Sequence, residues 1–176
     1  IEVEWSGWMR PAARTPEHLS LLSASGCSNL TFGLESGSPH VLARMKRLAH
    51  GATENIAADL QSCAEHGIRT CLTAIAGFPG ETEEDWNLTL EFFREHADVI
   101  DGVGLQSFKA LPLSPIGREI GTRHIPELER VEPLLYARNY DGAPSQRETI
   151  AREIEGRRVL LELGLAGKRR RGLLFR

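Results

Sequence analysis

"AIAGFPGETEEDW", residues 74–86, decides the fold, because it runs from an apolar stretch through a glycine-proline turn into an acidic helix start. A loop that only had to reverse the chain could be polar and loosely specified. This one brings the bare backbone of Gly77 to Gly80 to the end of a buried strand. Parallel α/β proteins keep their ligands at that end of their strands. The stretch therefore predicts a ligand site at the end of this strand.

The rest of the chain repeats this strand–helix order. Alternating or apolar runs predict strands at residues 1–5, 29–36, 68–77 and 101–108. Helical patterns lie between them, at residues 14–27, 38–45, 53–67 and 82–97. Alternation of strands and helices predicts a parallel sheet. Periodicity alone does not separate an open sheet from a barrel, and both place ligands at the carboxyl ends of the strands.

Local signals fix several of these helices. Thr15 and Pro16 suit an N-cap and a first helical position. Thr82 and Asp85 have the spacing of a capping box. Two helices carry apolar stripes that should face the sheet, namely Ile56, Leu60 and Cys63, and Trp86, Leu90 and Phe93.

Composition excludes several classes of protein. The 176 residues are 41% hydrophobic and 26% charged, which is typical of a soluble globular domain. The net charge of -3 argues against nucleic-acid binding, and no run is long and apolar enough for a membrane span or a signal peptide. Three scattered cysteines, Cys27, Cys63 and Cys71, favour reduced thiols and a cytoplasmic location. The six histidines show no metal-ligand spacing, so no metal site is predicted.

The candidate site residues follow from the predicted strand ends. Each has a structural alternative: Glu35 suits a helix start, Ser36 a turn, Ile75 the core, and Gly77 and Gly80 a positive φ. No catalytic side chain can be assigned from the pattern. The candidates are Arg10, Glu35, Ser36, Ile75, Gly77, Phe78, Pro79, Gly80, Gln106 and Lys109.

Two of these stretches carry a resemblance to a known family. "FGLESGSPHVLARM", residues 32–45, and "GFPGETEEDW", residues 77–86, resemble the fourth and fifth strands and following turns of radical S-adenosylmethionine (SAM) enzymes. "HGIRT", residues 66–70, and a Pro-rich stretch after residue 108 also fit. The resemblance covers residues 1–120. It implies an α/β fold, a parallel-sheet partial TIM-like barrel that comprises the C-terminal half, about strands 3 to 6 of six.

Residues 121–176 are expected to form a mainly helical extension with a basic tail. A helix is predicted over residues 146–165, because four apolar residues lie roughly in line along it: Ile150, Ile154, Leu161 and Leu165. Gly156 lowers the helix propensity of this stretch. The basic run at residues 167–176 reads as a solvated tail, or as a docking segment for an acidic partner.

The resemblance also implies cofactors. SAM would contact Glu35, Ser36, Ile75 and the turn from Gly77 to Gly80, while Arg10, Gln106 and Lys109 are weaker candidates for substrate contact. Members of the superfamily hold a [4Fe–4S] cluster on three closely spaced cysteines, and the cysteines of this chain are too scattered to converge. The cluster, and cobalamin if it is used, are therefore expected on segments outside this chain.

In the family, SAM is cleaved to a 5′-deoxyadenosyl radical. The resemblance implies that the complete protein is a cobalamin-dependent member, and such members commonly transfer a methyl group to carbon. The chain by itself is expected to be inactive. It starts without Met on an alternating stretch, which suggests a cut through a larger protein and a complementing N-terminal half or partner chain. The substrate would be a small molecule or a peptide. A non-catalytic, barrel-completing subunit and an unrelated α/β barrel that binds a nucleotide or sugar remain alternatives.

Overall fold

The computed structural model describes residues 3–12, 14–45, 52–109, 114, 118, 130–131, 134–135 and 146–166. Its centre is a parallel sheet of four strands in the order β1-β2-β3-β4. The strands are β1 (Trp5–Met9), β2 (Cys27–Glu35), β3 (Arg69–Ala76) and β4 (Gly102–Ser107). Each strand therefore pairs with the next one in sequence, as in the wall of an α/β barrel, and the fold class predicted from the sequence is confirmed.

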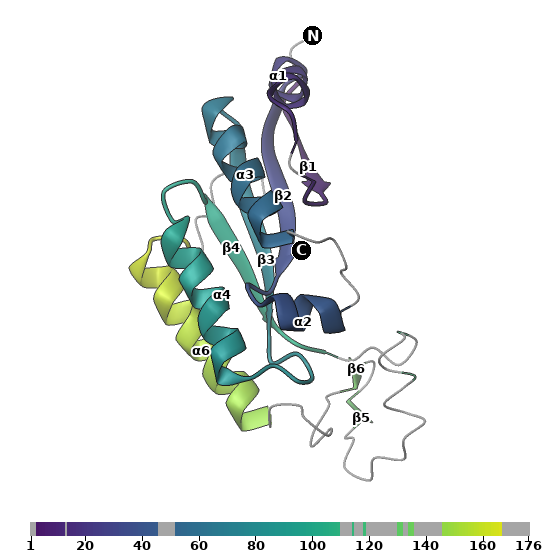
Figure 1. Cartoon of the computed structure of the whole chain (residues 1–176), viewed down its shortest axis with the longest axis vertical. Coiled ribbons are helices and arrows are strands. Elements are labelled where there is room, and N and C mark those ends of the chain that lie inside the picture. Colours follow the sequence, from purple (N-terminus) through teal and green to yellow (C-terminus); the bar gives the residue numbers. More distant parts are fainter. Residues whose placement is uncertain are drawn as a thin grey trace.

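Helices connect the strands (Figure 1). Helix α1 (Pro16–Ala24) joins β1 to β2, and α2 (Pro39–Arg44) and α3 (Ala52–Glu65) join β2 to β3. Helix α4 (Glu83–Glu95) joins β3 to β4, and α6 (Gln146–Glu162) follows β4 in sequence. Two short strands, β5 (Arg130–Val131) and β6 (Leu134–Leu135), pair antiparallel by themselves.

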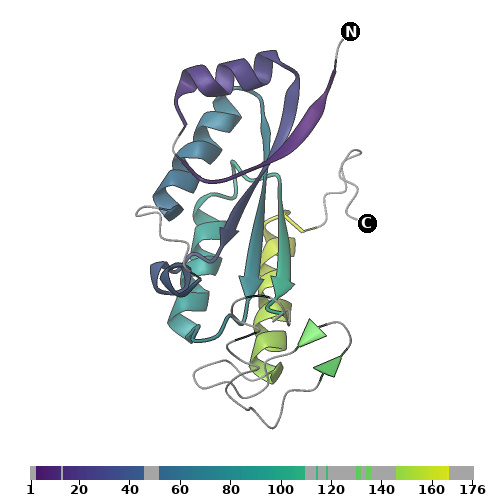
Figure 2. The ribbon, with the colours of Figure 1, turned by 90° about the vertical axis from the view of Figure 1, so that its right-hand side faces the viewer.

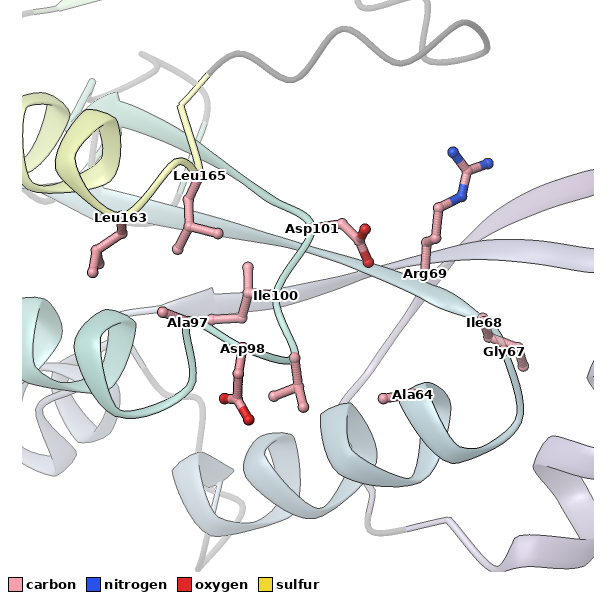
Figure 3. A pocket seen from close by; sticks show the side chains of 11 residues that line it. Ala64, Gly67, Ile68, Arg69, Ala97, Asp98, Ile100, Asp101, Leu163 and Leu165 are labelled. Carbon is pink, nitrogen blue, oxygen red and sulfur yellow. The ribbon is translucent and has the colours of Figure 1, made fainter.

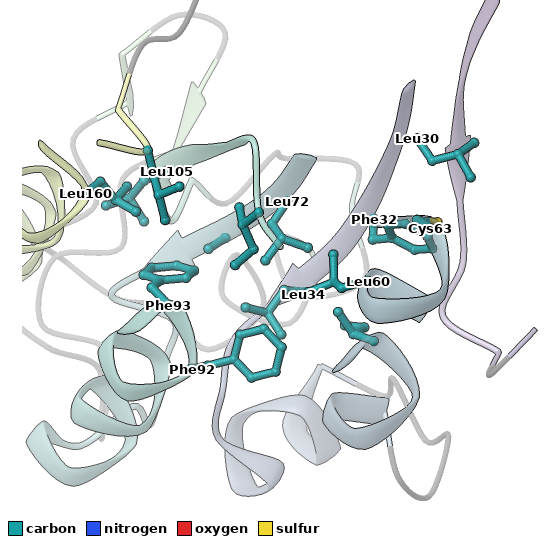
Figure 4. Packing of buried hydrophobic residues seen from close by; sticks show 14 of the residues in the cluster. Leu30, Phe32, Leu34, Leu60, Cys63, Leu72, Phe92, Phe93, Leu105 and Leu160 are labelled. Atoms are coloured by element: carbon teal, nitrogen blue, oxygen red, sulfur yellow. The ribbon is translucent and has the colours of Figure 1, made fainter. Parts of the chain in front are cut away.

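The larger helices lie on one face of the sheet, and the core lies between them and the strands (Figures 2 and 4). Side chains alternate along a strand, so every second residue of β2 and β3 faces these helices. Those residues are fully buried: Leu30, Phe32, Leu34, Leu72, Ala74 and Ala76. The predicted stripes of α3 and α4 are buried against them, as expected. The other face of the sheet is more open, since Trp8 is 66% exposed and Gly104 and Gln106 are also exposed.

Two sequence predictions were wrong in detail. The first strand runs from Trp5 to Met9 rather than ending at Trp5, and Val3 is exposed outside it, while residues 1–2 lie outside the described residues. In α6, Ile150, Ile154 and Leu161 are exposed, while Val159, Leu160 and the following Leu165 enter the core. The reason is Gly156, where an added Cβ would lie 2.6 Å from Leu105 Cδ2 and 2.9 Å from Trp86 Cζ2. Because Gly156 has no side chain, α6 can approach β4 and α4 closely at this position. The face of α6 that carries Gly156 therefore packs against the core, and the face that carries the isoleucines is exposed.

Helix α6 thus shares one core with the sheet, although the sequence assigned it to an extension. The predicted basic tail, residues 167–176, lies outside the described residues. Within the part that the structure describes, no helix is both long enough and apolar enough to cross a membrane.

Candidate functional site

The carboxyl ends of the strands bring most of the candidate residues to one edge of the sheet. Glu35 at the end of β2 is in register with Ala74, and Ile75 of β3 is in register with Gln106 of β4. Strand β1 ends earlier, because Met9 pairs with Phe32. The sheet therefore brings together Glu35, Ile75, the Gly77 turn and Gln106, while Arg10 follows the end of a shorter strand.

Glu35 has an unusual backbone. Its φ is +62°, and it is the one non-glycine residue with positive φ in the described segments. The pairing of β2 with β3 also shifts register between Gly33 and Glu35. A left-handed conformation costs a residue with a side chain about 1–2 kcal/mol. Such strain persists where the surroundings impose it, and it is concentrated at functional sites.

The turn after β3 depends on its glycines. Gly77 and Gly80 have φ values of +77° and +87°, and Glu81 N donates to Phe78 O at 2.9 Å. An added Cβ on Gly77 would lie 2.4 Å from the side chain of Thr149 in α6. An added Cβ on Gly80 would lie 2.5 Å from Arg44 Nε, which donates to Pro79 O at 3.0 Å. The turn is therefore clamped between α2 and α6.

The bare side of Gly77 faces α6, because the Thr149 side chain fills the space that an added Cβ would need. The side chain of Phe78 is also buried, and its ring meets Phe108 edge-on with centroids 5.1 Å apart. Ile75, next to the turn, is half-buried, and contacts of Ile75, Phe78 and Pro79 with SAM stay predictions.

The buried side chain of Glu81 holds the turn by hydrogen bonds. Its side chain is buried, and Oε2 accepts hydrogen bonds from Gly77 N at 2.7 Å and from Arg152 Nη1 at 2.9 Å. The same Arg152 nitrogen donates to Glu81 O at 3.2 Å. Burial raises the pKa of Glu81 to about 7, although Gly77 and Arg152 oppose the rise. Arg152 was missed in the sequence, because it lies 71 residues from Glu81 and no local pattern links them.

A second network joins the loop after β2 to the start of α4. The Asp85 carboxylate accepts hydrogen bonds from Ser38 Oγ, from His40 Nδ1 at 3.0 Å and from Thr82 N at 2.9 Å. With Thr82 it forms the predicted capping box. Burial raises the pKa of Asp85, but the bonds from Ser38, Thr82 and His40 outweigh burial and lower it to about 2.

Ser36 belongs to this same structural connection. It is fully buried, and its Oγ lies 3.3 Å from Thr89 Oγ1, which also accepts from Gly37 N at 2.9 Å. Gly37 is needed here, because an added Cβ would lie 2.5 Å from Leu88 O. These contacts favour the structural reading of Ser36, and a contact with SAM stays a prediction.

The three weaker candidates are all exposed. Arg10, Gln106 and Lys109 lie at the surface. The chain after Arg10 is held by Asp59 of α3, whose fully buried carboxylate accepts from Ala12 N at 3.1 Å and Arg14 N at 2.7 Å. Asp59 is a second positioning group that the sequence did not indicate. Whether Arg10, Gln106 or Lys109 meets substrate stays a prediction.

The described residues do not fit a [4Fe–4S] cluster. Cys27 and Cys63 are buried, Cys71 is half-buried, and burial raises the pKa of all three thiols. Within the described segments, no group of three His, Cys, Asp or Glu residues is placed to hold a metal ion. Contacts of SAM with Glu35 and with the Gly77–Gly80 turn stay predictions.

A pocket of about 330 Å³ lies at the opposite edge of the sheet, where β3 and β4 begin (Figure 3). Its wall combines the ends of α3 and α4 with Leu163 and Leu165 after α6. One of its acidic groups, Asp101, already accepts a hydrogen bond from Thr70 N at 3.0 Å. Because ligands of parallel α/β folds bind at the carboxyl ends, this pocket is not the candidate active site.

A parallel sheet with helices on one face, and each strand beside the next one in sequence, is the wall of an α/β barrel-type protein, a class that binds its ligands at the carboxyl ends of the strands. The chain belongs to the radical SAM superfamily, whose family model matches residues 2–93.

Relatives and structures agree with this assignment. The ribosomal protein uS12 methylthiotransferase RimO of Citrobacter koseri is 33% identical over 132 residues, which are 71% of this chain and 28% of that protein. The coproporphyrinogen III oxidase HemN of Escherichia coli has the same fold, with a TM-score of 0.68 at 21% identity over 92% of this chain and 32% of that one. The methyltransferase TsrM of Kitasatospora setae, with cobalamin and a [4Fe–4S] cluster bound, gives a TM-score of 0.61 at 23% identity, over 87% and 29%. The chain thus spans under a third of the length of these proteins.

Proposed function

We propose that this chain supplies the SAM-binding edge of a radical SAM barrel, and that the complete protein cleaves SAM reductively to a 5′-deoxyadenosyl radical. The observation that carries the proposal is Glu35, a non-glycine residue with φ of +62° at the carboxyl end of a central strand. A position that only terminated a strand would be filled more stably by glycine. The adjacent turn offers backbone groups for the adenine, and the Glu35 carboxylate offers acceptors for SAM hydroxyl or amino groups.

Two substitutions of Glu35 in the complete protein test this proposal. Glu35→Gln keeps the shape and removes the charge, and Glu35→Gly also relieves the backbone strain. A hydrogen bond to a charged group is worth about 1.5–3 kcal/mol, so both variants should bind SAM about ten- to a hundredfold more weakly. Melting is recorded for both variants, so that a loss of SAM affinity can be separated from a loss of stability.

Glu91→Gln, an exposed position on α4, is the matched control and should leave SAM affinity unchanged. Affinity is measured by equilibrium dialysis with radiolabelled SAM, and melting by calorimetry. If both Glu35 variants bind SAM as tightly as the parent, Glu35 has no part in the site and the proposal fails.

Segments that are not in this chain would hold the [4Fe–4S] cluster. They would also cover the open face of the sheet, where Trp8 and Gln106 are exposed. We expect a complementing half-barrel or partner chain there, because an open sheet face and an edge strand favour association. Sedimentation of the 176-residue chain at micromolar concentration should give an oligomer, or a complex with the complementing segment. A stable monomer would contradict this.

The group that is transferred has two candidates. RimO is named as a methylthiotransferase of a ribosomal protein, and at 33% identity it favours methylthio transfer to a protein. TsrM is named as a radical SAM methyltransferase, with cobalamin bound in one structure and a tryptophan substrate in another, so it favours cobalamin-dependent methyl transfer to a small molecule. Cobalamin absorbance of the complete, purified protein separates them, because methylthio transfer predicts none and the cobalamin route predicts one per chain.

A non-catalytic, barrel-completing subunit in the cytoplasm is the remaining alternative. Formation of 5′-deoxyadenosine from SAM and dithionite decides it. The complete protein should form it, and the Glu35→Gln variant should form it more slowly at limiting SAM. No product from the complete, cluster-loaded protein would favour the non-catalytic role.

A further inference from the structure

Helix α6 reaches the Gly77–Gly80 turn through two contacts that the proposed function does not use. Arg152 Nη1 donates to Glu81 Oε2 at 2.9 Å and to Glu81 O at 3.2 Å. Thr149, one turn earlier, fills the space beside Gly77. Both residues belong to the start of α6, where the helix lies at the carboxyl ends of the strands (Figure 1).

The Glu81–Arg152 ion pair is expected to add little to the folding free energy of the protein. The Glu81 side chain is fully buried and that of Arg152 is 14% exposed, so both charges lose most of their hydration. Glu81 Oε1 is buried with no hydrogen-bond partner within the described structure. Apolar side chains of the same size would often be at least as stable in such a place. The ion pair instead orients the Glu81 carboxylate, because Oε2 then accepts the hydrogen bond from Gly77 N.

That N–H sets the orientation of the peptide at the very point where β3 ends. Gly77 N donates to Glu81 Oε2 at 2.7 Å, and Glu81 N closes the turn on Phe78 O. Arg152 holds the carboxylate in place, so the chain of contacts runs from α6 to Glu81 and then to the turn. On the other side, Arg44 of α2 holds Pro79 O.

We propose that Arg152 and Glu81 are positioning residues, through which α6 holds the Gly77–Gly80 turn in the form that binds SAM. The inference rests on the proposed function. It adds that SAM affinity depends on how α6 docks against the sheet and the turn.

Two substitutions and their combination test the proposal in the complete protein. Glu81→Gln and Arg152→Met keep the size of each side chain and remove the ion pair. Each should weaken SAM binding about tenfold, and the double variant should bind like either single one, because both act through one connection. Arg158→Met is the matched control, since Arg158 lies on the same helix, is 70% exposed and pairs with Glu162. It should bind SAM like the parent.

The pH profile separates positioning from a general loss of stability. The groups that face Glu81 are Arg152 from α6, Asp85 from α4 and the N–H of Gly77, and its pKa is raised to about 7 by burial. SAM binding by the parent should therefore strengthen between pH 6 and 8 as Glu81 loses its proton. Glu81→Gln should lack this component, while ionisation of SAM itself affects both proteins equally. If Arg152→Met does not fold, Arg152→Lys replaces it in the test. Lysine keeps a cation beside Glu81, so this variant should bind SAM more weakly than the parent but more tightly than Glu81→Gln.

The outcomes distinguish the two ideas. Loss of SAM affinity in Glu35→Gln, together with parent-like affinity in Arg152→Met and Glu81→Gln, overturns this inference and leaves the proposed function standing. Additive losses in the double variant, or identical pH profiles for the parent and Glu81→Gln, also overturn it. Unchanged affinity in Glu35→Gln removes the proposed function itself.

Discussion

Asp85→Asn should destabilise the protein by an amount that the structure sets. The carboxylate accepts from Ser38, His40 and Thr82, and so ties the loop after β2 to the first turn of α4. Burial raises its pKa, yet the hydrogen bonds prevail and lower the pKa from 3.8 to about 2. One pKa unit corresponds to about 1.4 kcal/mol, so the shift corresponds to about 2 kcal/mol of folding free energy at neutral pH.

The sign of the pH dependence follows from that shift. A carboxyl group with a lowered pKa in the folded state stabilises the protein above its unfolded pKa, here near 3.8. The contribution is lost as the pH falls toward 2. The difference in stability between the parent and Asp85→Asn should therefore be constant between pH 5 and 8 and shrink below pH 4.

Urea unfolding followed by circular dichroism at several pH values measures this difference. At pH 7 the variant should lose about 2 kcal/mol, which lowers the melting temperature by about 4–8 °C for a domain of this size. Glu84→Gln is the matched control, because Glu84 is exposed in the same helical turn. A loss in Asp85→Asn no larger than in Glu84→Gln, or one that persists unchanged at pH 3, would refute the reasoning.

Two further predictions concern α6 and iron. Gly156→Ala should destabilise the protein by about 1–3 kcal/mol despite the better helix propensity of alanine, because the new methyl group would overlap Leu105 and Trp86; a melting temperature at or above that of the parent would contradict the close packing of α6. After anaerobic reconstitution with iron and sulfide, the 176-residue chain should show no stoichiometric cluster absorbance. One cluster per chain, lost when Cys27, Cys63 and Cys71 are replaced together, would show that these residues converge after all.

Many features of the fold could be predicted from short stretches of the sequence. Helix caps, glycine stops and apolar stripes depend on residues a few positions apart, so the capping box of Thr82 and Asp85 and the stripe of Trp86, Leu90 and Phe93 could be predicted and are confirmed. The order of strands and helices then implied a parallel sheet with Glu35 and Gly77 at one edge, as the structure has it. Family membership followed from two short motifs in that order.

Only the tertiary structure decided which groups support those motifs. Arg152 meets Glu81 across 71 residues, and Asp59 holds Arg14 across 45, distances over which no periodicity carries information. The inward face of α6 was misread, because the pattern of isoleucines says nothing of how closely Gly156 lets the helix approach Trp86. Likewise, the sequence showed that Gly77 must be bare but not that Thr149 fills the space, since contacts between distant segments exist only once the sheet has brought them together.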